Sequence, residues 1–428
     1  MHFVIVIVLN EIERKSTMAN KIKGLVCCVL MVCNFAFAET EVASELNKQT
    51  LSGDWSGIRS DLYSKGVSME FTHKSDLLSN ASGGIKSGSV WMANTEAAIN
   101  LDMGKLAGWE ATTVFVQYHV QHGDQSKDFN GSYVGSFSGV DNIETGTSTG
   151  QFFQAWLQKN SADNSLSVLA GLYAIDSEFY VTETSGLFIQ PPYGTSAKMA
   201  QTGKNGPPIF PVGALAVRMK YTSPDYYLQA ALTDGVPGDP NDPRGTHIKL
   251  DKGDGTLSIV ELGYNSSVEG KSFNKTALGF WRYSAHAPDL VNGNPRLDLG
   301  YYLLAERTLR AEQNDPAQGL SGFVRFGTVN KNAYQADWSG SLGLRYQGLF
   351  DGRDDDTAGV AVTTSHASNK YRQLNASDLS ETVVEISYRA QLQPWLAAQP
   401  MVQRIYNPNM DTTLGNASVI GVRIELVL

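Results

Sequence analysis

The stretch SVIGVRIELVL, residues 418–428, alternates between two kinds of side chain. Ile420, Val422, Ile424 and Leu426 share one face, and Arg423 shares the other face with a glycine and a glutamate. A repeat of two residues is the signature of a β-strand with one apolar face and one polar face. The apolar face could meet the core of a soluble sandwich or the acyl chains around a membrane barrel, and alternation alone does not choose between them.

Four other segments repeat this pattern, and their polar faces carry charge. Segments 111–121, 212–221, 338–348 and 381–391 each place apolar residues on one face and Arg, Lys, Glu, His or Gln on the other. A soluble core rarely faces so many charges inward, because each buried charge would need a partner. The wet lumen of a barrel would solvate them, so the pattern favours a barrel.

The spacing of the predicted strands supports the same interpretation. Odd-numbered connections such as 78–91, 122–151, 174–211, 234–255 and 364–380 are long, and even-numbered ones such as 160–164 and 222–224 are short. Bacterial outer-membrane barrels have short periplasmic turns and long external loops. We therefore predict an all-β fold, a transmembrane antiparallel up-and-down β-barrel of about 16 strands. The predicted strand cores are 67–77, 92–101, 111–121, 152–159, 165–173, 212–221, 225–233, 256–265, 274–284, 299–307, 320–328, 338–348, 356–363, 381–391, 398–405 and 418–428.

The N-terminus resembles an export signal. Residues 20–23 are basic, residues 25–37 form an apolar core too short to span a bilayer, and residues 36–38 read Ala-Phe-Ala, a cleavage site. We expect a signal peptide over 1–38, a periplasmic N-terminal segment or plug over 39–66, and the barrel domain over 67–428. Met18 would be a well-proportioned signal start, so residues 1–17 can be read as an upstream mis-start.

Composition excludes several classes of function. The three cysteines, at positions 27, 28 and 33, all lie in the expected signal, so no disulfide, thiolate metal site or cysteine nucleophile is expected. Removing residues 1–38 takes four of 34 basic and two of 43 acidic residues, which leaves 30 − 41 = −11. A negative chain disfavours nucleic acid as a partner. No remaining stretch approaches 18 apolar residues, so no membrane-spanning helix is predicted. Motifs for catalysis or metal binding are poor, and we expect no enzyme activity, cofactor or metal.

Trp156 stands apart from the other tryptophans. If Phe153, Ala155 and Leu157 face lipid, Trp156 points into the lumen between Gln154 and Gln158. A sugar stacks its C–H face on an aromatic ring and hydrogen-bonds its hydroxyls to amides. The pattern therefore suggests a sugar contact, while a slip in register would send Trp156 to lipid.

A set of ordered motifs resembles the carbohydrate-selective (OprB-type) porin family. The resemblance covers roughly residues 51–428 and implies a 16-stranded outer-membrane barrel that passes sugars by facilitated diffusion, with external loops folded inward. It also implies outer-membrane lipid and the barrel assembly machinery as partners, and a monomer or homotrimer. The chain departs from outer-membrane barrels in ending on Leu428 rather than an aromatic residue. The motifs are residues 51–59 (LSGDWSGIR), 105–109, 170–173, 176–179, 210–211, 234–237 and 394–408.

Candidate solute contacts follow from the predicted lumen faces, because paired donors and acceptors suit neutral, hydroxyl-rich solutes. We expect only part of this set to touch solute and the rest to form a charge ladder across the wall. The candidates are Glu70, Asn94, Glu96, Gln117, His119, Gln154, Trp156, Gln158, Arg218, Glu261, Arg282, Arg325, Arg345, Glu385, Arg389 and Arg423.

The connection 174–211 is the expected constriction. A structureless loop of this length is unusual unless it is functional. The alternative is an external flap with no contact with solute. The residues predicted to narrow the channel are Asp176, Glu178, Phe179, Tyr180, Phe188 and Tyr193.

Three other functions remain open at this point. A general ion or solute porin would share the fold without sugar selectivity. A barrel enzyme would need a Ser/His pair near one rim, and no such pair stands out in the sequence. A surface adhesin or receptor would bind its partner through the long loops.

Overall fold

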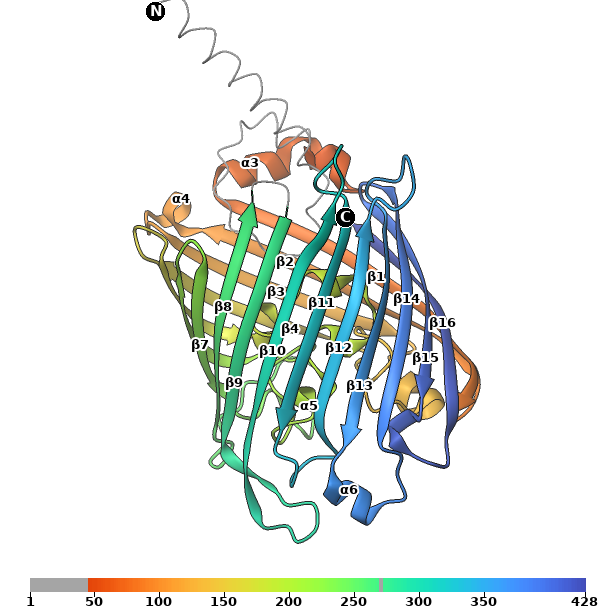
Figure 1. Cartoon of the computed structure of the whole chain (residues 1–428). Helices are drawn as coiled ribbons and strands as arrows, with labels where there is room; N and C mark the ends of the chain where they lie inside the picture. Colours follow the sequence, from red (N-terminus) through yellow and green to blue (C-terminus); the bar gives the residue numbers. More distant parts are fainter. Residues whose placement is uncertain (1–44, 269–271) are drawn as a thin grey trace, which may run out of the picture.

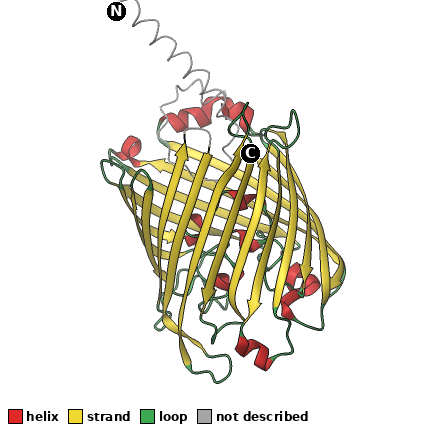
Figure 2. Cartoon of the chain, in the orientation of Figure 1, coloured by secondary structure: helices red, strands yellow, loops and turns green. Residues whose placement is uncertain are grey.

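The computed structural model describes residues 45–268 and 272–428. The predicted signal peptide, 1–38, lies outside the described residues. Sixteen antiparallel strands form one closed barrel in which each strand pairs with its sequence neighbours and β1 pairs with β16 (Figures 1 and 2). The strands are β1 (Val67–Gly84), β2 (Gly88–Asp102), β3 (Thr112–Gly123), β4 (Thr149–Asn160), β5 (Leu166–Tyr173), β6 (Ala214–Thr222), β7 (Tyr226–Asp234), β8 (Thr256–Val268), β9 (Ser272–Pro288), β10 (Pro295–Ala311), β11 (Gly319–Val329), β12 (Ala336–Gln347), β13 (Thr357–Ala367), β14 (Ser380–Gln393), β15 (Leu396–Tyr406) and β16 (Gly415–Val427).

All sixteen predicted strands are present, but the rhythm of the connections is less regular than expected. The segment 78–91 is not a long loop. β1 extends to Gly84 and β2 begins at Gly88, so only a tight turn separates them. The connections after β9 and β11 are also short. The predicted strand cores end where polar and glycine residues begin. A two-stranded extension beyond the wall tolerates such residues on both faces, so β1 and β2 continue past these points. Within the described residues, no helix is long and apolar enough to cross a bilayer.

The alternation seen in the sequence separates the two faces of the wall. On β16, Ile420 is half exposed and points outward, while Arg423 is buried on the inner face. On β12, Leu342 is 59% exposed, and its neighbour Ser341 is buried. This pattern matches a wall whose apolar outside meets acyl chains and whose polar inside does not.

One β-bulge changes the predicted face of β4. The register shifts between the pairs Gln117–Gln154 and Tyr118–Phe152, so Phe153 has no partner of its own. Phe152 therefore points outward at 47% exposure, and Phe153 is buried inside. A bulge places two consecutive residues on one face, so the prediction that Phe153 faces lipid is wrong, whereas Trp156 does face inward.

Two external connections fold into the barrel (Figure 2). The longer one, residues 174–213, includes the short helix α5 (Ala197–Ala200) and joins β5 to β6. Phe179, Tyr180 and Met199 from this connection pack in one buried cluster with side chains of β5 to β11. The shorter one, residues 124–148, buries Phe129 and Val140 against β14, β15 and β16. The two loops therefore partly fill the interior, which is not open throughout.

A short N-terminal segment lies at the rim where the barrel closes. The helix α3 (Ile58–Ser64) sits at the same end of the barrel as the C-terminus (Figure 1). The guanidinium of Arg59 donates to the carbonyl oxygens of Leu428 (3.2 Å) and Met69 (3.0 Å). The carboxylate of Asp54 accepts from the N–H of Ser60, 2.8 Å away, near the start of this helix. These bonds join the segment to both strands of the β1–β16 seam.

Candidate functional site

Three wall glutamates hold the long inserted loop by its backbone. Glu261 on β8, Glu306 on β10 and Glu385 on β14 are each no more than 3% exposed. Each carboxylate accepts hydrogen bonds from backbone N–H groups of the loop, which gives a buried charge the partners it needs. The bonds run from Tyr180 to Glu261 (2.9 Å), from Glu183 (3.0 Å) and Thr184 (2.8 Å) to Glu306, and from Ile189 (2.8 Å) and Gln190 (3.0 Å) to Glu385.

Arg325 on β11 binds the same loop through its carbonyl oxygens rather than its N–H groups. Its guanidinium is 1% exposed and donates to the carbonyl oxygens of Tyr180 (2.7 Å) and Pro192 (3.1 Å), and to those of Tyr193 and Gly194. It also lies 4.1 Å from the centre of the Tyr180 ring. A planar group with five donors suits several carbonyls at once.

The shorter loop is fixed in the same way. Arg423 on β16 bonds the carboxylate of Asp76 on β1 at 2.6 Å, and reaches Asp141 (3.2 Å) and Asn142 (2.7 Å) in the loop. Glu381 on β14 accepts backbone N–H groups from the same loop. Four of the predicted lumen residues, Glu261, Arg325, Glu385 and Arg423, therefore face inward but are covered by the loops that they hold.

The predicted constriction residues divide into two groups. Phe179, Tyr180, Phe188 and Tyr193 are each at most 3% exposed and pack the loop against the wall. Asp176 accepts the N–H of Phe210 within the loop. Glu178 bonds the polar side chains of β5 and β6, as described below.

A chain of hydrogen bonds runs along the inner faces of β2, β3 and β4. Glu96 accepts from the amides of Asn94 (2.6 Å) and Gln117 (2.9 Å). Gln117 in turn accepts from Gln154 (3.1 Å), and Gln154 accepts from the indole N–H of Trp156 (3.3 Å). Five candidates from three adjacent strands thus form one connected network.

A second set of hydrogen bonds begins at Gln158, two residues beyond Trp156 on β4, and reaches β6. Gln158 accepts from Arg218 at 2.6 Å, and Arg218 bonds Glu178 of the inserted loop at 2.7 Å. The same carboxylate accepts the hydroxyl of Tyr173 at 2.7 Å and lies 3.6 Å from the ammonium of Lys220. The inserted loop therefore contributes the carboxylate of Glu178 to this set of polar groups, rather than an aromatic surface.

Trp156 is half-buried and has an open flank. Its ring lies 5.0 Å from that of Phe115, centre to centre. On the next strand it is paired with Gly171, whose φ of 144° is one that residues with a side chain rarely adopt. A Cβ at Gly171 would come within 2.6 Å of the Trp156 backbone. Glycine at this position leaves the indole without a side-chain cover from β5.

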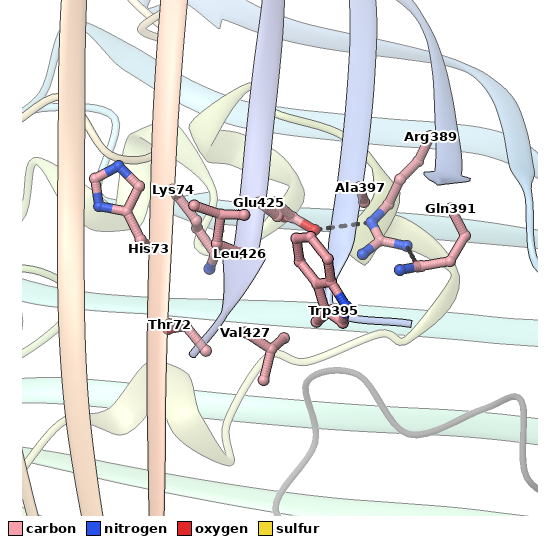
Figure 3. Close-up of a pocket in the computed structure, with 10 residues that line it drawn as sticks. All are labelled: Thr72, His73, Lys74, Arg389, Gln391, Trp395, Ala397, Glu425, Leu426 and Val427. Atoms are coloured by element: carbon pink, nitrogen blue, oxygen red, sulfur yellow. Dashed lines mark hydrogen bonds and ion pairs between the residues drawn. The ribbon is translucent and has the colours of Figure 1, made fainter. Parts of the chain in front are cut away.

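The opposite wall carries charged groups with partial access to the channel. Arg345 on β12 donates to the carbonyl oxygen of Glu183 at 3.2 Å. Lys275 on β9 donates to the carbonyl oxygen of Val181 at 2.7 Å. Arg389 on β14 bonds Glu425 on β16 at 2.8 Å, beside Trp395 (Figure 3). The pocket drawn there has a volume of about 20 Å³, room for about one water molecule and too small for a sugar ring.

Longer-range electrostatic interactions extend this set of groups along the inner wall. Glu425 interacts with Arg389 and Lys74, and Glu70 interacts with Lys74 and Glu96. Glu70, on β1, is itself exposed. We call the whole set the polar ring. Its members are Glu70, Lys74, Glu96, Gln117, Gln154, Trp156, Gln158, Glu178, Glu183, Arg218, Lys220, Lys275, Arg345, Arg389 and Glu425.

Two predicted lumen residues, Arg282 and His119, do not belong to the polar ring. Arg282 is exposed on the outer face of β9, because its neighbour Trp281 is fully buried inside. The prediction that Arg282 faces the lumen is therefore wrong, because the apolar Trp281 occupies the inner face of β9. His119 does point inward, but its Nε2 lies 3.1 Å from the carbonyl oxygen of Pro211, and the loop covers it completely.

The sequence analysis missed several members of the ring. Lys220 and Glu425 share a face with Arg218 and Arg423, so the same alternation could have placed them among the candidates. Lys275 lies on the same face of β9 as Trp281. Because Arg282 was assigned to the inner face, Lys275 was placed on the outer face and missed. No pattern within 174–211 would have singled out Glu183.

Comparison with known proteins agrees with this architecture. Residues 92–428 match the family model described as carbohydrate-selective porin, OprB family. The chain is 24% identical to Porin B of Pseudomonas aeruginosa, over 89% of this chain and 92% of that protein. It is 23% identical to the putative porin QuiX of Acinetobacter baylyi, over 89% of this chain and 93% of that protein.

The fold is shared with a solved porin. The high-pH structure of Pseudomonas putida OprB superposes with a TM-score of 0.80 at 22% identity, over 89% of this chain and 99% of that one. The low-pH structure superposes with a TM-score of 0.59 over the same shares. The family is one of channels, not enzymes, and its barrels stand in the outer membrane. This chain therefore belongs to the carbohydrate-selective porin, OprB family.

Proposed function

We propose that sugars cross the barrel through the polar ring, with Trp156 as the stacking surface and the amides of Gln117 and Gln158 as hydrogen-bonding partners. The observation that carries this proposal is the network from Glu96 to Trp156, together with the bonds from Gln158 to Glu178. Glu96, Gln117, Trp156 and Gln158 are partly exposed, whereas Gln154 and Arg218 are buried and hold their neighbours in place. The family assignment indicates carbohydrate transport, and the polar ring is the site that we assign to it.

The charge balance of the ring suits a neutral solute. Its cations are Lys74, Arg218, Lys220, Lys275, Arg345 and Arg389, and its anions are Glu70, Glu96, Glu178, Glu183 and Glu425. Nearly equal numbers of opposite charges, most of them paired, give no strong attraction to one ion. Conduction requires binding that is favourable enough to enter and weak enough to leave, and a single aromatic face with amide partners meets that need.

The test is sugar block in planar bilayers. The purified protein is reconstituted, its conductance is measured, and mono- and disaccharides are titrated. Trp156→Ala should weaken block about tenfold, because loss of one aromatic contact costs about 1.4 kcal/mol. Trp156→Phe should recover part of the loss. Trp91→Ala, on the outer wall, is the matched control and should leave block unchanged.

The results also separate the runner-up function. Conductance that no sugar alters would indicate a general pore. Block that survives Trp156→Ala would place the sugar elsewhere in the barrel. Block that weakens in the Trp156 variants and not in Trp91→Ala supports the ring.

The remaining parts of the chain have roles that follow from export. Residues 1–38 act as a signal peptide that is removed, 39–66 lie at the periplasmic mouth, and 67–428 form the barrel that the barrel assembly machinery inserts into outer-membrane lipid. N-terminal sequencing of the protein from outer membranes should give a chain starting at Glu39. Retention of Met1 would contradict this assignment.

A further inference from the structure

The seam between β1 and β16 differs from every other junction in the described wall. All other neighbouring strands are consecutive in the chain and are joined by the connection between them, whereas β1 and β16 belong to opposite ends of the sequence. Their pairing runs from Thr72–Val427 to Gly84–Gly415. Bringing together residues so far apart in sequence has a larger entropic cost than closing a hairpin. The seam is therefore the junction at which we expect the barrel to open first.

Residues 45–66, which we call the strap, cover one end of this seam. The helix α3 of the strap lies beside the C-terminus (Figure 1). The N–H of Leu51 donates to the carbonyl oxygen of Val427 at 2.8 Å, and the N–H of Leu428 donates to that of Phe71, also at 2.8 Å. Hydrogen bonding thus continues past the last paired residues of the seam and onto the strap.

Arg59 of the strap bridges the two strands. Its Nη1 donates to the carbonyl oxygen of Leu428 at 3.2 Å, and its Nη2 to that of Met69 at 3.0 Å. Nη1 also donates to the hydroxyl of Thr50 (3.1 Å) and to the carbonyl oxygen of Gly53 (3.2 Å) within the strap. A planar group with five donors can serve several acceptors at once. One side chain, 5% exposed, therefore joins the start of β1, the end of the chain and the strap.

The strap is folded around this arginine rather than loosely attached. Asp54 is 5% exposed, and its carboxylate accepts the N–H of Ser60 at 2.8 Å. The ring of Trp55 lies 5.0 Å from the guanidinium carbon of Arg59 and 5.9 Å from the ring of Phe71 on β1. A buried polar group whose partners are all in place holds a single geometry, so Arg59 is fixed in its bridging position.

We propose that the strap is a lock on the β1–β16 seam, and that docking of Arg59 on Leu428 and Met69 holds the barrel closed. The end of a strand pair frays first, because its last residues have neighbours on one side only. Arg59 binds at that end. Leu428 is the last residue of the chain, so the lock forms only when β16 is in place. This role is separate from the passage of sugars and does not depend on it.

The rate of unfolding in SDS measures the lock on protein purified from outer membranes. A folded barrel and its unfolded chain migrate differently in an SDS gel, so samples taken over time give the rate. Arg59→Met should unfold about tenfold faster or more, because the seam loses hydrogen bonds from a charged donor. Lys65→Met is the matched control: Lys65 belongs to the same segment and pairs with Asp61 in an exposed position, where an ion pair contributes little. It should leave the rate unchanged.

A disulfide across the seam separates a lock from a general loss of stability. Residues 45–428 contain no cysteine, and directly opposed residues of antiparallel strands lie at a separation that a disulfide can span. Leu77→Cys with Val422→Cys joins β1 to β16. Leu342→Cys with Val362→Cys joins β12 to β13 and is the control pair.

Each pair is oxidised and the unfolding rate is compared with and without Arg59→Met. The seam disulfide should abolish the effect of Arg59→Met, because the seam is then closed covalently. The β12–β13 disulfide should leave the tenfold effect in place. Comparing rates within one disulfide background removes the stabilisation that each disulfide adds by itself.

Two outcomes would overturn the proposal. One is an unfolding rate of Arg59→Met equal to that of Lys65→Met. The other is an effect of Arg59→Met that is the same in both disulfide backgrounds, which would mean that the strap stabilises the barrel without acting on the seam. Should Arg59→Met fail to assemble, Arg59→Lys is put through the same comparison, since it keeps the charge but loses the planar fork that reaches both strands.

Discussion

The inside of this barrel has two regions that contain the same residue types and differ in what covers them. Where the loops dock, Glu261, Glu385 and Arg325 are at most 1% exposed and bond to backbone. In the polar ring, the side chains of Lys220 and Glu178 keep 31% and 22% exposure and bond to other side chains. Buried charges fix a structure because removing one partner leaves the other without compensation. Partly solvated charges can exchange partners with a solute.

The comparison shows that facing inward is not sufficient to mark a solute contact. A charged residue on the inner wall of a wide barrel can hold a loop or line a channel, and alternation in the sequence is identical for both. The backbone of the inserted loop decides between them. The first three predictions below each act on one of the two regions, and the last acts outside both.

The largest effect is expected where one side chain holds most of a loop. Arg325→Met would leave four loop carbonyls without their donor, at about 1–3 kcal/mol for each buried group. The loop 174–213 should then leave the barrel, and open conductance should rise about twofold or more as the channel widens. Trypsin should also cut at Lys198, which is buried in the native protein.

Arg282→Met is the matched control for that variant, because Arg282 lies on the outer face of β9. It should leave conductance and proteolysis unchanged. A conductance change in Arg282→Met equal to that in Arg325→Met would contradict the placement of both residues.

A smaller effect is expected at the position that keeps Trp156 uncovered. Gly171→Ala adds a side chain at a φ of 144° and against the Trp156 backbone, at a cost of roughly 1–3 kcal/mol for the backbone strain alone. The melting temperature in detergent should fall and sugar block should weaken. Gly186→Ala, where a Cβ meets open space, should change neither. An unaltered blocking constant in Gly171→Ala would remove the Trp156 face from the sugar path.

A modest effect is expected from one charge of the ring. Glu96→Gln keeps an acceptor for Gln117 but removes a negative charge from the channel wall. The cation-to-anion permeability ratio should fall about twofold, because surrounding charges and salt screen a single group. Reversal potentials in a salt gradient measure it, with Glu110→Gln in an exposed turn as the control. A ratio identical to wild type would exclude Glu96 from the conducting path.

The smallest effect is expected outside both regions, at the external rim. The pKa of Asp289 lies below its ordinary value because the ammonium of Lys370 bonds its carboxylate. A lowered pKa stabilises the folded state above the unfolded-state pKa, and the contribution is lost as the pH falls through the folded-state pKa. Hydrogen exchange of residues 289–294 should therefore be faster in Lys370→Gln than in wild type at pH 7, with the difference vanishing in acid. A difference that persisted in acid would point to another cause.

The fold could be predicted from the sequence because lipid imposes a strict period of two on every strand. That constraint gave all sixteen strands and the inward direction of Glu96, Gln117, Trp156 and Arg218. It failed at Phe153, where a bulge breaks the period, and at Arg282, where an apolar Trp281 occupies the inner face. The bulge explains the first failure. The second arises because the inserted loops make part of the interior apolar, so hydrophobicity no longer marks the outside.

The candidate site was only partly predictable for a related reason. The polar residues from Asn94 to Gln158 lie on the adjacent strands β2, β3 and β4, so they could be grouped from strand order. The partners of Glu178, Glu183 and Arg325 depend on the path of the loop across the barrel. That path is set by contacts with distant strands, which no local pattern encodes.

The inserted loops also constrain the order in which the protein can reach its final form. Leu187 is held by Gln399, 212 residues later, and Val140 by Gln403, 263 residues later. Contacts between such distant residues form slowly, because a long chain must close before they stabilise anything. The strands that hold these carbonyls close the wall at its C-terminal end, so both loops can dock fully only when those strands have joined the barrel. Narrowing of the channel is thus a late event in the maturation of this porin.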